Sequence, residues 1–321
     1  MKCINKYFKY TVCILFIVVF ISGCSNPKSY VTEYEAKSYD KSVFTGSLFA
    51  TNLCVATNNK ELANYTTDAS IRAVGLFDVN NSQVLYAQNL HERIYPASTT
   101  KLLTAYVVLK YGNLSDMVTV SENATQFESA AQVCGLQAGD QLTLEALLNG
   151  LLLYSGNDNA VAIAEHISGS VAGFSDLMNK EARNIGATNT HFINPHGLHE
   201  DEHYTTAYDL YLIFNECIKD ERFVNIIGQT SYTATITNPN AGTRTATWLP
   251  TNYYSLGKVA QPDNVTVIGG KTGTTDQAGS CVILLLRDSK NNPYISMVMG
   301  APNKDTLYKD MAALISALPL N

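Results

Sequence analysis

The order of strand-type and helical segments along the chain constrains its fold more than any other feature. Apolar runs at Ala73–Phe77 and Gln83–Tyr86 flank a polar turn, which is typical of a β-hairpin. Runs of buried-strand type return near the other end, at Ser280–Leu286 and Tyr294–Met299. Strands at both ends around a helical middle predict an α+β domain whose sheet pairs the two ends of the chain.

The middle of the chain has mostly helical spacing, and strand-type runs rich in threonine follow it. The predicted helices are a run through Leu102–Lys110 that stops at Gly112, then Leu142–Tyr154, Asn159–Ile167, Phe174–Ile185 and Thr206–Ile218, with a last one at Asp305–Leu318. Strands are expected at Tyr232–Thr237 and Arg244–Trp248. A polar turn, Ser155-Gly156-Asn157-Asp158, separates two of the helices, and Asn157 or Asp158 is suited to cap the second.

Residues 1–23 have the features of a secretory signal peptide. Three lysines precede the apolar run Val12–Ile21, which has about ten residues where a membrane-spanning helix needs roughly 20. The run ends in Ile21-Ser22-Gly23-Cys24, which resembles the lipobox of bacterial lipoproteins. The pattern predicts cleavage before Cys24, lipidation of Cys24, and an extracytoplasmic protein anchored by lipid to the bacterial cell membrane.

Residues 24–43 are polar and lack apolar periodicity, so we expect a lipidated tether there. Residues 44–321 are expected to form one catalytic domain, in which no role is assigned to 44–64. The net charge of the 321 residues is -6, and loss of the three signal-peptide lysines would change it to -9. An acidic chain of this kind is not expected to bind nucleic acid.

Four cysteines would remain in the mature domain besides the lipidated one. They are Cys54, Cys134, Cys217 and Cys281. Their wide spacing contains no CxxC pair, so zinc-ribbon and thioredoxin-like motifs are unsupported. Disulfides among the four stay open at this point.

Ser98-Thr99-Thr100-Lys101 opens the predicted helix after Pro96, and a spacing of three residues puts Ser98 and Lys101 on one helix face. A serine hydroxyl becomes a good nucleophile when a base takes its proton. Lysine can be that base when burial or a nearby cation lowers its pKa. The SxxK pattern alone is weak, because it also occurs at Ser25/Lys28, Ser38/Lys41 and Ser255/Lys258.

Two further short motifs follow. Ser155-Gly156-Asn157 is an SxN element in a polar turn, although a plain capping turn is the alternative and SxN recurs at Ser121/Asn123 and Ser289/Asn291. Lys271-Thr272-Gly273 occurs once, just before a strand-type run. A strand edge with these side chains can lie beside an extended peptide and bind its carboxylate. A β-turn with a surface lysine is the alternative.

Together the motifs occur in the order SxxK, SxN and KTG, as in penicillin-binding proteins and class A β-lactamases. With Tyr95-Pro96-Ala97 before Ser98, Asn194-Pro195-His196-Gly197-Leu198, and Gly270-Lys271-Thr272-Gly273-Thr274-Thr275, residues 72–318 resemble low-molecular-mass penicillin-binding proteins, specifically serine D-Ala-D-Ala carboxypeptidases. The resemblance implies a β-lactamase/transpeptidase-like fold, with an antiparallel sheet formed by both chain ends and a helical subdomain between them.

The resemblance also implies the activity. It implies removal of the terminal D-Ala from peptidoglycan stem pentapeptides, covalent inhibition by β-lactam antibiotics, and no metal or organic cofactor. Ser98 would be the acylated nucleophile, Lys101 its general base, and Ser155 the relay that protonates the leaving D-alanine.

The remaining motif residues would bind substrate by the same resemblance. Asn157 would hold the substrate amide, and Lys271 with Thr272 and Thr274 would bind the terminal carboxylate. Gly273 has no side chain to obstruct the substrate backbone. The N–H groups of Ser98 and Thr274 would form the oxyanion hole.

Three other functions are alternatives. A serine β-lactamase of the same fold would need a glutamate that positions water, whereas Glu200 and Glu202 lie in a different motif. A non-catalytic penicillin-binding or sensor protein could keep the fold. The cluster His196–His203, with His191 nearby, suggests a metallopeptidase, but no HExxH is present and a solvated polar loop is the better interpretation.

Overall fold

The computed structural model describes residues 52–263 and 265–319. The predicted signal peptide (1–23), the lipidation site Cys24 and the tether (24–43) lie outside the described residues. Within the described part, no helix combines the length and the apolar character needed to cross a membrane.

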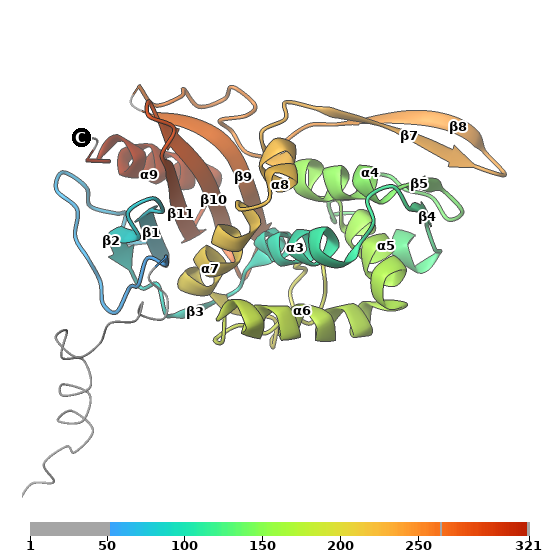
Figure 1. The fold of residues 1–321 in the computed structure, drawn as a ribbon, viewed down its shortest axis with the longest axis horizontal. Helices are drawn as coiled ribbons and strands as arrows, with labels where there is room; N and C mark the ends of the chain where they lie inside the picture. Colours follow the sequence, from blue (N-terminus) through green and yellow to red (C-terminus); the bar gives the residue numbers. More distant parts are fainter. Residues whose placement is uncertain (1–51, 264, 320–321) are drawn as a thin grey trace, which may run out of the picture. The chain divides into compact units, whose positions relative to one another are not determined.

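A five-stranded antiparallel sheet joins the two ends of the described chain (Figure 1). In spatial order its strands are β2 (Gln83–Gln88), β1 (Ala73–Asp78), β11 (Pro293–Ala301), β10 (Gly279–Asp288) and β9 (Val265–Thr275). Strand β1 pairs with β11, with Ala73 opposite Met299. The predicted sheet from both chain ends is therefore confirmed, and the predicted hairpin is β1–β2.

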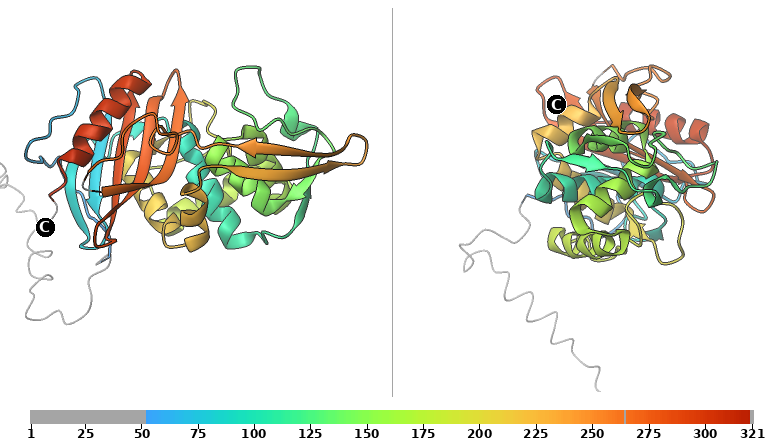
Figure 2. Two further views of the ribbon diagram at one scale, coloured as in Figure 1. Left: turned by 90° about the horizontal axis from the view of Figure 1, so that it is seen from above. Right: turned by 90° about the vertical axis from the view of Figure 1, so that its right-hand side faces the viewer.

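Helices cover both faces of this sheet, and more helices form a group beside it (Figures 1 and 2). Helix α9 (Lys304–Ser316) packs on one face, while α7 (Ala207–Cys217) and α8 (Glu221–Ile227) contact the sheet from the other side. The other helices are η1 (Ala97–Thr100), α3 (Lys101–Tyr111), η2 (Asn123–Thr125), α4 (Leu144–Asn149), η3 (Gly150–Tyr154), α5 (Asn157–Ser168) and α6 (Val171–Ile185). Here η1 and η2 are 3₁₀ helices and η3 is π-helical.

Alternating side chains of β10 enter two apolar clusters. Val282 and Leu284 belong to the cluster that contains α9, whereas Ile283 and Leu285 belong to the cluster that contains α3 and α7. Because both faces are covered, β10 reads as a continuous apolar run in the sequence instead of an alternating one.

A second, four-stranded sheet lies beside the helical group. Its order is β4 (Met117–Thr119), β5 (Gln141–Thr143), β7 (Tyr232–Asn238) and β8 (Gly242–Trp248), while β3 (Arg93–Ile94) and β6 (Thr205–Thr206) form a separate pair. Strands β7 and β8 confirm the two predicted threonine-rich strands and form a long ribbon (Figure 1). The sequence does not predict β4 and β5, because three residues are too few to show alternation.

The predicted helix Leu142–Tyr154 is wrong at its start and correct at its end, Tyr154. Leu142 lies in β5, and Thr143 caps α4 by accepting a hydrogen bond of 3.1 Å from the N–H of Ala146. At Gly150 the α-helix gives way to the π-helical η3. A Cβ at Gly150 would lie 2.3 Å from Asn159 Nδ2, so glycine permits a close approach of α5 at this point.

Residues 52–62, within the segment that had no assigned role, cover the edge of the sheet at β2. Lys60 and Ala87 exchange backbone hydrogen bonds of 2.8 and 3.0 Å. The N–H of Cys54 donates to the Tyr211 hydroxyl at 2.9 Å, and the Tyr208 hydroxyl donates to Cys54 O at 3.0 Å. Protection of this edge is a physical role for the segment, because unpaired edge strands invite aggregation. The four cysteines of the described chain, Cys54, Cys134, Cys217 and Cys281, are free thiols.

Candidate active site

Ser98 lies in η1, directly before α3, at a point where three segments approach closely. Ala97 has a φ of 47°, a left-handed conformation that is uncommon for residues other than glycine. A Cβ at Gly197 would lie 1.9 Å from Ala97 O, and one at Gly273 would lie 2.8 Å from Ser98 N. Glycine at these two positions therefore lets the 194–198 loop and β9 contact the turn that carries Ser98.

Lys101 is the fully buried residue that begins α3, one turn after Ser98. Its Nζ atom lies 3.0 Å from Ser98 Oγ, 2.7 Å from Asn157 Oδ1 and 2.6 Å from His196 O. Burial lowers the pKa of Lys101 well below its usual value, and the nearby Lys271 lowers it further, against the opposing effect of Asp158. Burial and Lys271 therefore both favour the neutral form of Lys101.

A neutral lysine has two N–H donors and one lone pair. Asn157 Oδ1 and His196 O can only accept hydrogen bonds, so they take the two N–H groups. The lone pair of Lys101 then faces Ser98 Oγ. This arrangement suits a base that removes the Ser98 proton.

Ser155 and Lys271 meet on the other side of the site. Ser155 follows η3 in a left-handed conformation, with a φ of 68°, and Lys271 lies inside β9. Lys271 Nζ donates to Ser155 Oγ at 2.8 Å and to Thr272 O at 2.9 Å. Lys271 is fully buried, and burial lowers its pKa to about 7. The alternative of a β-turn with a surface lysine is therefore wrong, and the KTG motif lies in β9, the edge strand that directly precedes β10.

The predicted cap of the helix after Ser155 is also wrong. Gly156 is the N-cap of α5, and Asn157 and Asp158 lie in its first turn. Their side chains have other partners: Asn157 binds Lys101, while Asp158 accepts the N–H groups of Cys134 and Leu136 at 2.8 and 3.0 Å. Burial raises the pKa of Asp158, and these backbone hydrogen bonds oppose that rise.

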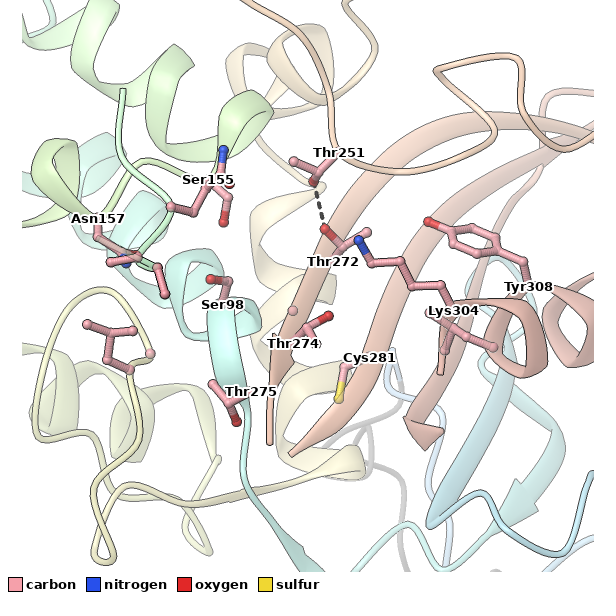
Figure 3. A pocket seen from close by; sticks show the side chains of 17 residues that line it. Ser98, Ser155, Asn157, Thr251, Thr272, Thr274, Thr275, Cys281, Lys304 and Tyr308 are labelled. Carbon is pink, nitrogen blue, oxygen red and sulfur yellow. Dashed lines mark hydrogen bonds between the residues drawn. The ribbon is translucent and has the colours of Figure 1, made fainter. Parts of the chain in front are cut away.

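A cavity of about 260 Å³ brings six of the predicted site residues together (Figure 3). They are Ser98, Ser155, Asn157, Thr272, Gly273 and Thr274. Figure 3 shows Ser98 between Ser155 and Asn157 on one side and the β9 threonines on the other. Lys101 and Lys271 do not line the cavity themselves, but each contacts a serine that does, Ser98 and Ser155 respectively.

The cavity also has walls that sequence reasoning missed. Thr251 lines it and its hydroxyl lies 2.6 Å from that of Thr272. Lys304 and Tyr308 contribute from α9, and residues 130–132 contribute from a loop. None of these belongs to a motif, although a lysine at the start of a helix that follows the last strand could have drawn attention to Lys304.

The histidine-rich segment is not a solvated loop throughout. Residues 200–202 are exposed, but His203 is buried. Its Nδ1 accepts the Ile193 N–H at 3.0 Å, so Nε2 carries the proton and donates to Thr100 Oγ1 at 2.8 Å. Burial lowers the pKa of His203 to about 3, which keeps it neutral. The segment thus packs against η1, and among the described residues no group of three or more His, Cys, Asp or Glu side chains is placed to hold a metal ion.

Known proteins share this fold. The solved structure of the Streptomyces K15 DD-transpeptidase matches with a TM-score of 0.72 and 27% identity, over 78% of this chain and 98% of that one. This part of the chain therefore has a DD-peptidase fold. Residues 58–303 match the family Peptidase S11, D-alanyl-D-alanine carboxypeptidase. The chain belongs to this family.

Two curated D-alanyl-D-alanine carboxypeptidases are similar to this chain in sequence. The D-alanyl-D-alanine carboxypeptidase DacA of Haemophilus influenzae is 36% identical over 71% of this chain and 56% of its own length. DacF of Bacillus subtilis is 38% identical over 48% of this chain and 40% of its own length. The chain thus spans about half the length of these two relatives.

Proposed function

We propose that the protein is a serine-type D-alanyl-D-alanine carboxypeptidase, which removes the terminal D-Ala of peptidoglycan stem pentapeptides through an acyl-enzyme on Ser98. One observation carries the proposal: buried Lys101 lies 3.0 Å from Ser98 Oγ, and its other two hydrogen-bond partners, Asn157 Oδ1 and His196 O, can only accept. Of these three partners, only the serine can give a proton to Lys101.

In the acylation step Lys101 takes the proton of Ser98, and Ser98 Oγ attacks the carbonyl carbon between the two D-alanines. The N–H groups of Ser98 and Thr274 stabilise the oxyanion. Ser155 relays a proton to the leaving nitrogen, the C–N bond breaks, and D-alanine departs. Water then hydrolyses the ester and restores the Ser98 hydroxyl.

The KTG strand binds the end of the substrate that leaves. A charged Lys271 attracts the terminal carboxylate, and the hydroxyls of Thr272 and Thr274 donate hydrogen bonds to it. Asn157 holds the amide of the penultimate residue. The same groups would receive the carboxylate and ring carbonyl of a β-lactam, which makes such antibiotics covalent inhibitors.

The purified full-length protein, in detergent, tests the proposal with a pentapeptide that ends in D-Ala-D-Ala. We expect release of free D-alanine, and loss of that release in Ser98→Ala. A peptide that ends in D-Ala-L-Ala is the matched control substrate. Absence of release by the unmodified protein would overturn the proposal.

The same preparation separates the alternatives. Fast turnover of penicillin would indicate a β-lactamase, and a stable penicillin adduct without release of D-alanine would indicate a sensor. Loss of activity in a chelator would indicate a metallopeptidase. We expect a long-lived adduct, release of D-alanine, and no effect of the chelator.

We also propose that cleavage before Cys24 and its lipidation anchor the protein on the outer side of the bacterial cell membrane. The support is the lipobox-like Ile21-Ser22-Gly23-Cys24 after a short apolar run. Labelled palmitate should enter the unmodified protein and Cys13→Ser, but not Cys24→Ser. Equal labelling of the Cys24→Ser variant would contradict the anchor.

A further inference from the structure

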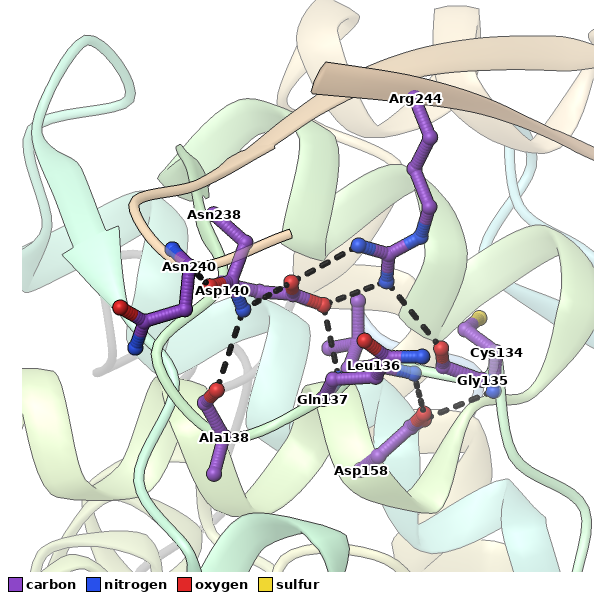
Figure 4. A network of polar contacts seen from close by, with 10 residues as sticks. All are labelled: Cys134, Gly135, Leu136, Gln137, Ala138, Asp140, Asp158, Asn238, Asn240 and Arg244. Carbon is purple, nitrogen blue, oxygen red and sulfur yellow. Dashed lines mark hydrogen bonds and ion pairs between the residues drawn. The ribbon is translucent and has the colours of Figure 1, made fainter. Parts of the chain in front are cut away.

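One wall of the cavity is a loop that forms hydrogen bonds to α5 near one end and to the β7–β8 ribbon at the other. We call residues 130–140 the cavity loop. Residues 130–132 line the cavity that contains Ser98. At this end, the N–H of Asn157 donates to Gln132 O at 2.8 Å, and Asp158 accepts two further N–H groups of the loop (Figure 4). The loop is thus bonded directly to the turn of α5 that binds Lys101.

At its other end the loop is attached to the β7–β8 ribbon through Asp140 (Figure 4). Arg244 of β8 donates to the two carboxylate oxygens of Asp140 at 2.8 and 2.5 Å. Asn238 of β7 donates to the same carboxylate at 3.0 Å, and so does the N–H of Gln137 at 2.7 Å. Asp140 is fully buried. Burial raises the pKa of Asp140, but the hydrogen bonds from Arg244, Gln137 and Asn238, together with the charge of Arg244, outweigh burial, so the pKa is lowered overall.

Arg244 makes a second attachment. Its Nη2 donates to Gly135 O at 3.3 Å, between the two loop N–H groups that Asp158 binds. Neither Arg244 nor Asp140 lines the cavity. One guanidinium on the ribbon therefore binds the loop at two points, and the loop connects it to the cavity, which Arg244 does not line.

We propose that Arg244 and Asp140 are positioning residues for acylation of Ser98: their ion pair holds the cavity loop against α5, and so fixes Asn157 relative to Lys101. The path is continuous, from Arg244 to Asp140 and Gly135, along the loop to Gln132, and on to Asn157. This inference rests on the proposed function.

The loop should shift rather than unfold when the ion pair is lost. The hydrogen bonds to Asp158 and from Asn157 do not involve Arg244, so we expect them to persist in an Arg244 variant. An uncompensated buried carboxylate, however, draws in water or a proton, and the loop adjusts around it. Misplacement of catalytic groups by about 1 Å costs up to about 100-fold in rate.

The test is the second-order rate constant for acylation of the full-length protein by a fluorescent penicillin, measured well below the melting temperature of each variant. We expect Arg244→Gln and Asp140→Asn each to slow acylation about 10- to 100-fold. Arg244→Lys keeps the charge but not the two-pronged contact, so it should be intermediate. The double variant should be no slower than the slower single variant, because both remove one interaction.

Arg222→Gln is a matched control. Arg222 also pairs with an aspartate, Asp220, and donates a hydrogen bond to a backbone carbonyl, that of Leu109. It neither lines the cavity nor contacts the cavity loop. We expect a smaller change in melting temperature, because this ion pair is more exposed than that of Arg244, and unchanged acylation. Acylation of Arg244→Gln and Arg244→Lys at the unmodified rate would overturn the proposal and leave a purely stabilising ion pair. If the glutamine variant does not fold, the lysine variant and Asp140→Asn decide the matter in the same way.

The proposed function and the positioning role of Arg244 can be overturned separately. An unmodified protein that is acylated but releases no D-alanine would overturn the proposed function alone, and the comparison of Arg244 variants would still be valid. A normal release of D-alanine with no effect of Arg244 would overturn the positioning role alone.

Discussion

Lys271 Nζ donates a hydrogen bond of 2.8 Å to Ser155 Oγ, across a separation of 116 residues in the chain. The contact joins the five-stranded sheet, through β9, to the helical group, through the turn before α5. Lys101 and Lys271 are both buried and have lowered pKa values, and the Nζ atom of each contacts the hydroxyl of a serine that lines the same cavity. Two lysine–serine pairs therefore face the space where a substrate would lie.

Replacement of Ser155 by alanine should lower kcat for release of D-alanine by about 10²- to 10⁴-fold, the range of one proton-transfer group. The variant loses the hydroxyl that binds Lys271 and leaves that lysine with one fewer partner. Ser121→Ala is the matched control, since Ser121 also begins an SxN sequence but donates to Glu165 instead. Equal loss in both variants would mean that Ser155 has no special role.

The pH dependence of kcat/KM should follow the two lysines in opposite directions. Lys101 must be neutral, so activity rises as pH rises through its lowered pKa. Lys271 must be charged to bind a carboxylate, and its pKa is about 7, so kcat/KM should fall as pH rises above that value. Lys271→Arg keeps its charge and should lack the falling limb. A falling limb that persists in this variant would assign it to another group.

Gly197→Ala should lower the free energy of unfolding by about 2 to 5 kcal/mol, since a left-handed alanine adds strain and its Cβ overpacks the turn. The φ of Gly197 is 88°, and a Cβ there would lie 1.9 Å from Ala97 O. Gly169→Ala is the control, because Gly169 has a φ of 74° but nothing within 4 Å of the added Cβ. It should cost about 1 to 2 kcal/mol. Urea unfolding of both variants measures the difference, and equal costs would exclude the close contact.

Lys304→Ala should raise KM for a peptide with a free terminal carboxylate by about three- to tenfold, with a smaller change in kcat. Lys304 lines the cavity and lies 5.9 Å from the centre of the Tyr253 ring. Lys258 lies 5.0 Å from the same ring but does not line the cavity, so Lys258→Ala is the control. An unchanged KM in the Lys304 variant would show that this charge does not contact substrate.

The parts of the fold that the sequence predicts are those with long, strong patterns. The runs that became β10 and β11 are continuous and apolar because both faces of the sheet are covered. Helix α6 (Val171–Ile185) has a clear amphipathic pattern and ends at Gly186, as predicted. Short elements are not predicted, because they contain too few residues to show a pattern: β4 and β5 have three residues each, and α8 has seven.

The site was predictable where side-chain identity and order carry the information, as for Ser98, Ser155 and Lys271. Long-range contacts were not. Nothing in the local sequence of Asp158 indicates that it binds the backbone of residues 134–136, and a first-turn aspartate usually indicates a cap. His203 was expected in solvent because its neighbours are charged, whereas its burial depends on Thr100, 103 residues away.

Intact-protein mass spectrometry with penicillin shows whether Ser98 forms the acyl-enzyme. We expect a single, slowly hydrolysed adduct, which peptide mapping assigns to Ser98 and which is missing from Ser98→Ala. An adduct on another residue, or none on an unmodified protein that is folded, would contradict an acyl-enzyme on Ser98.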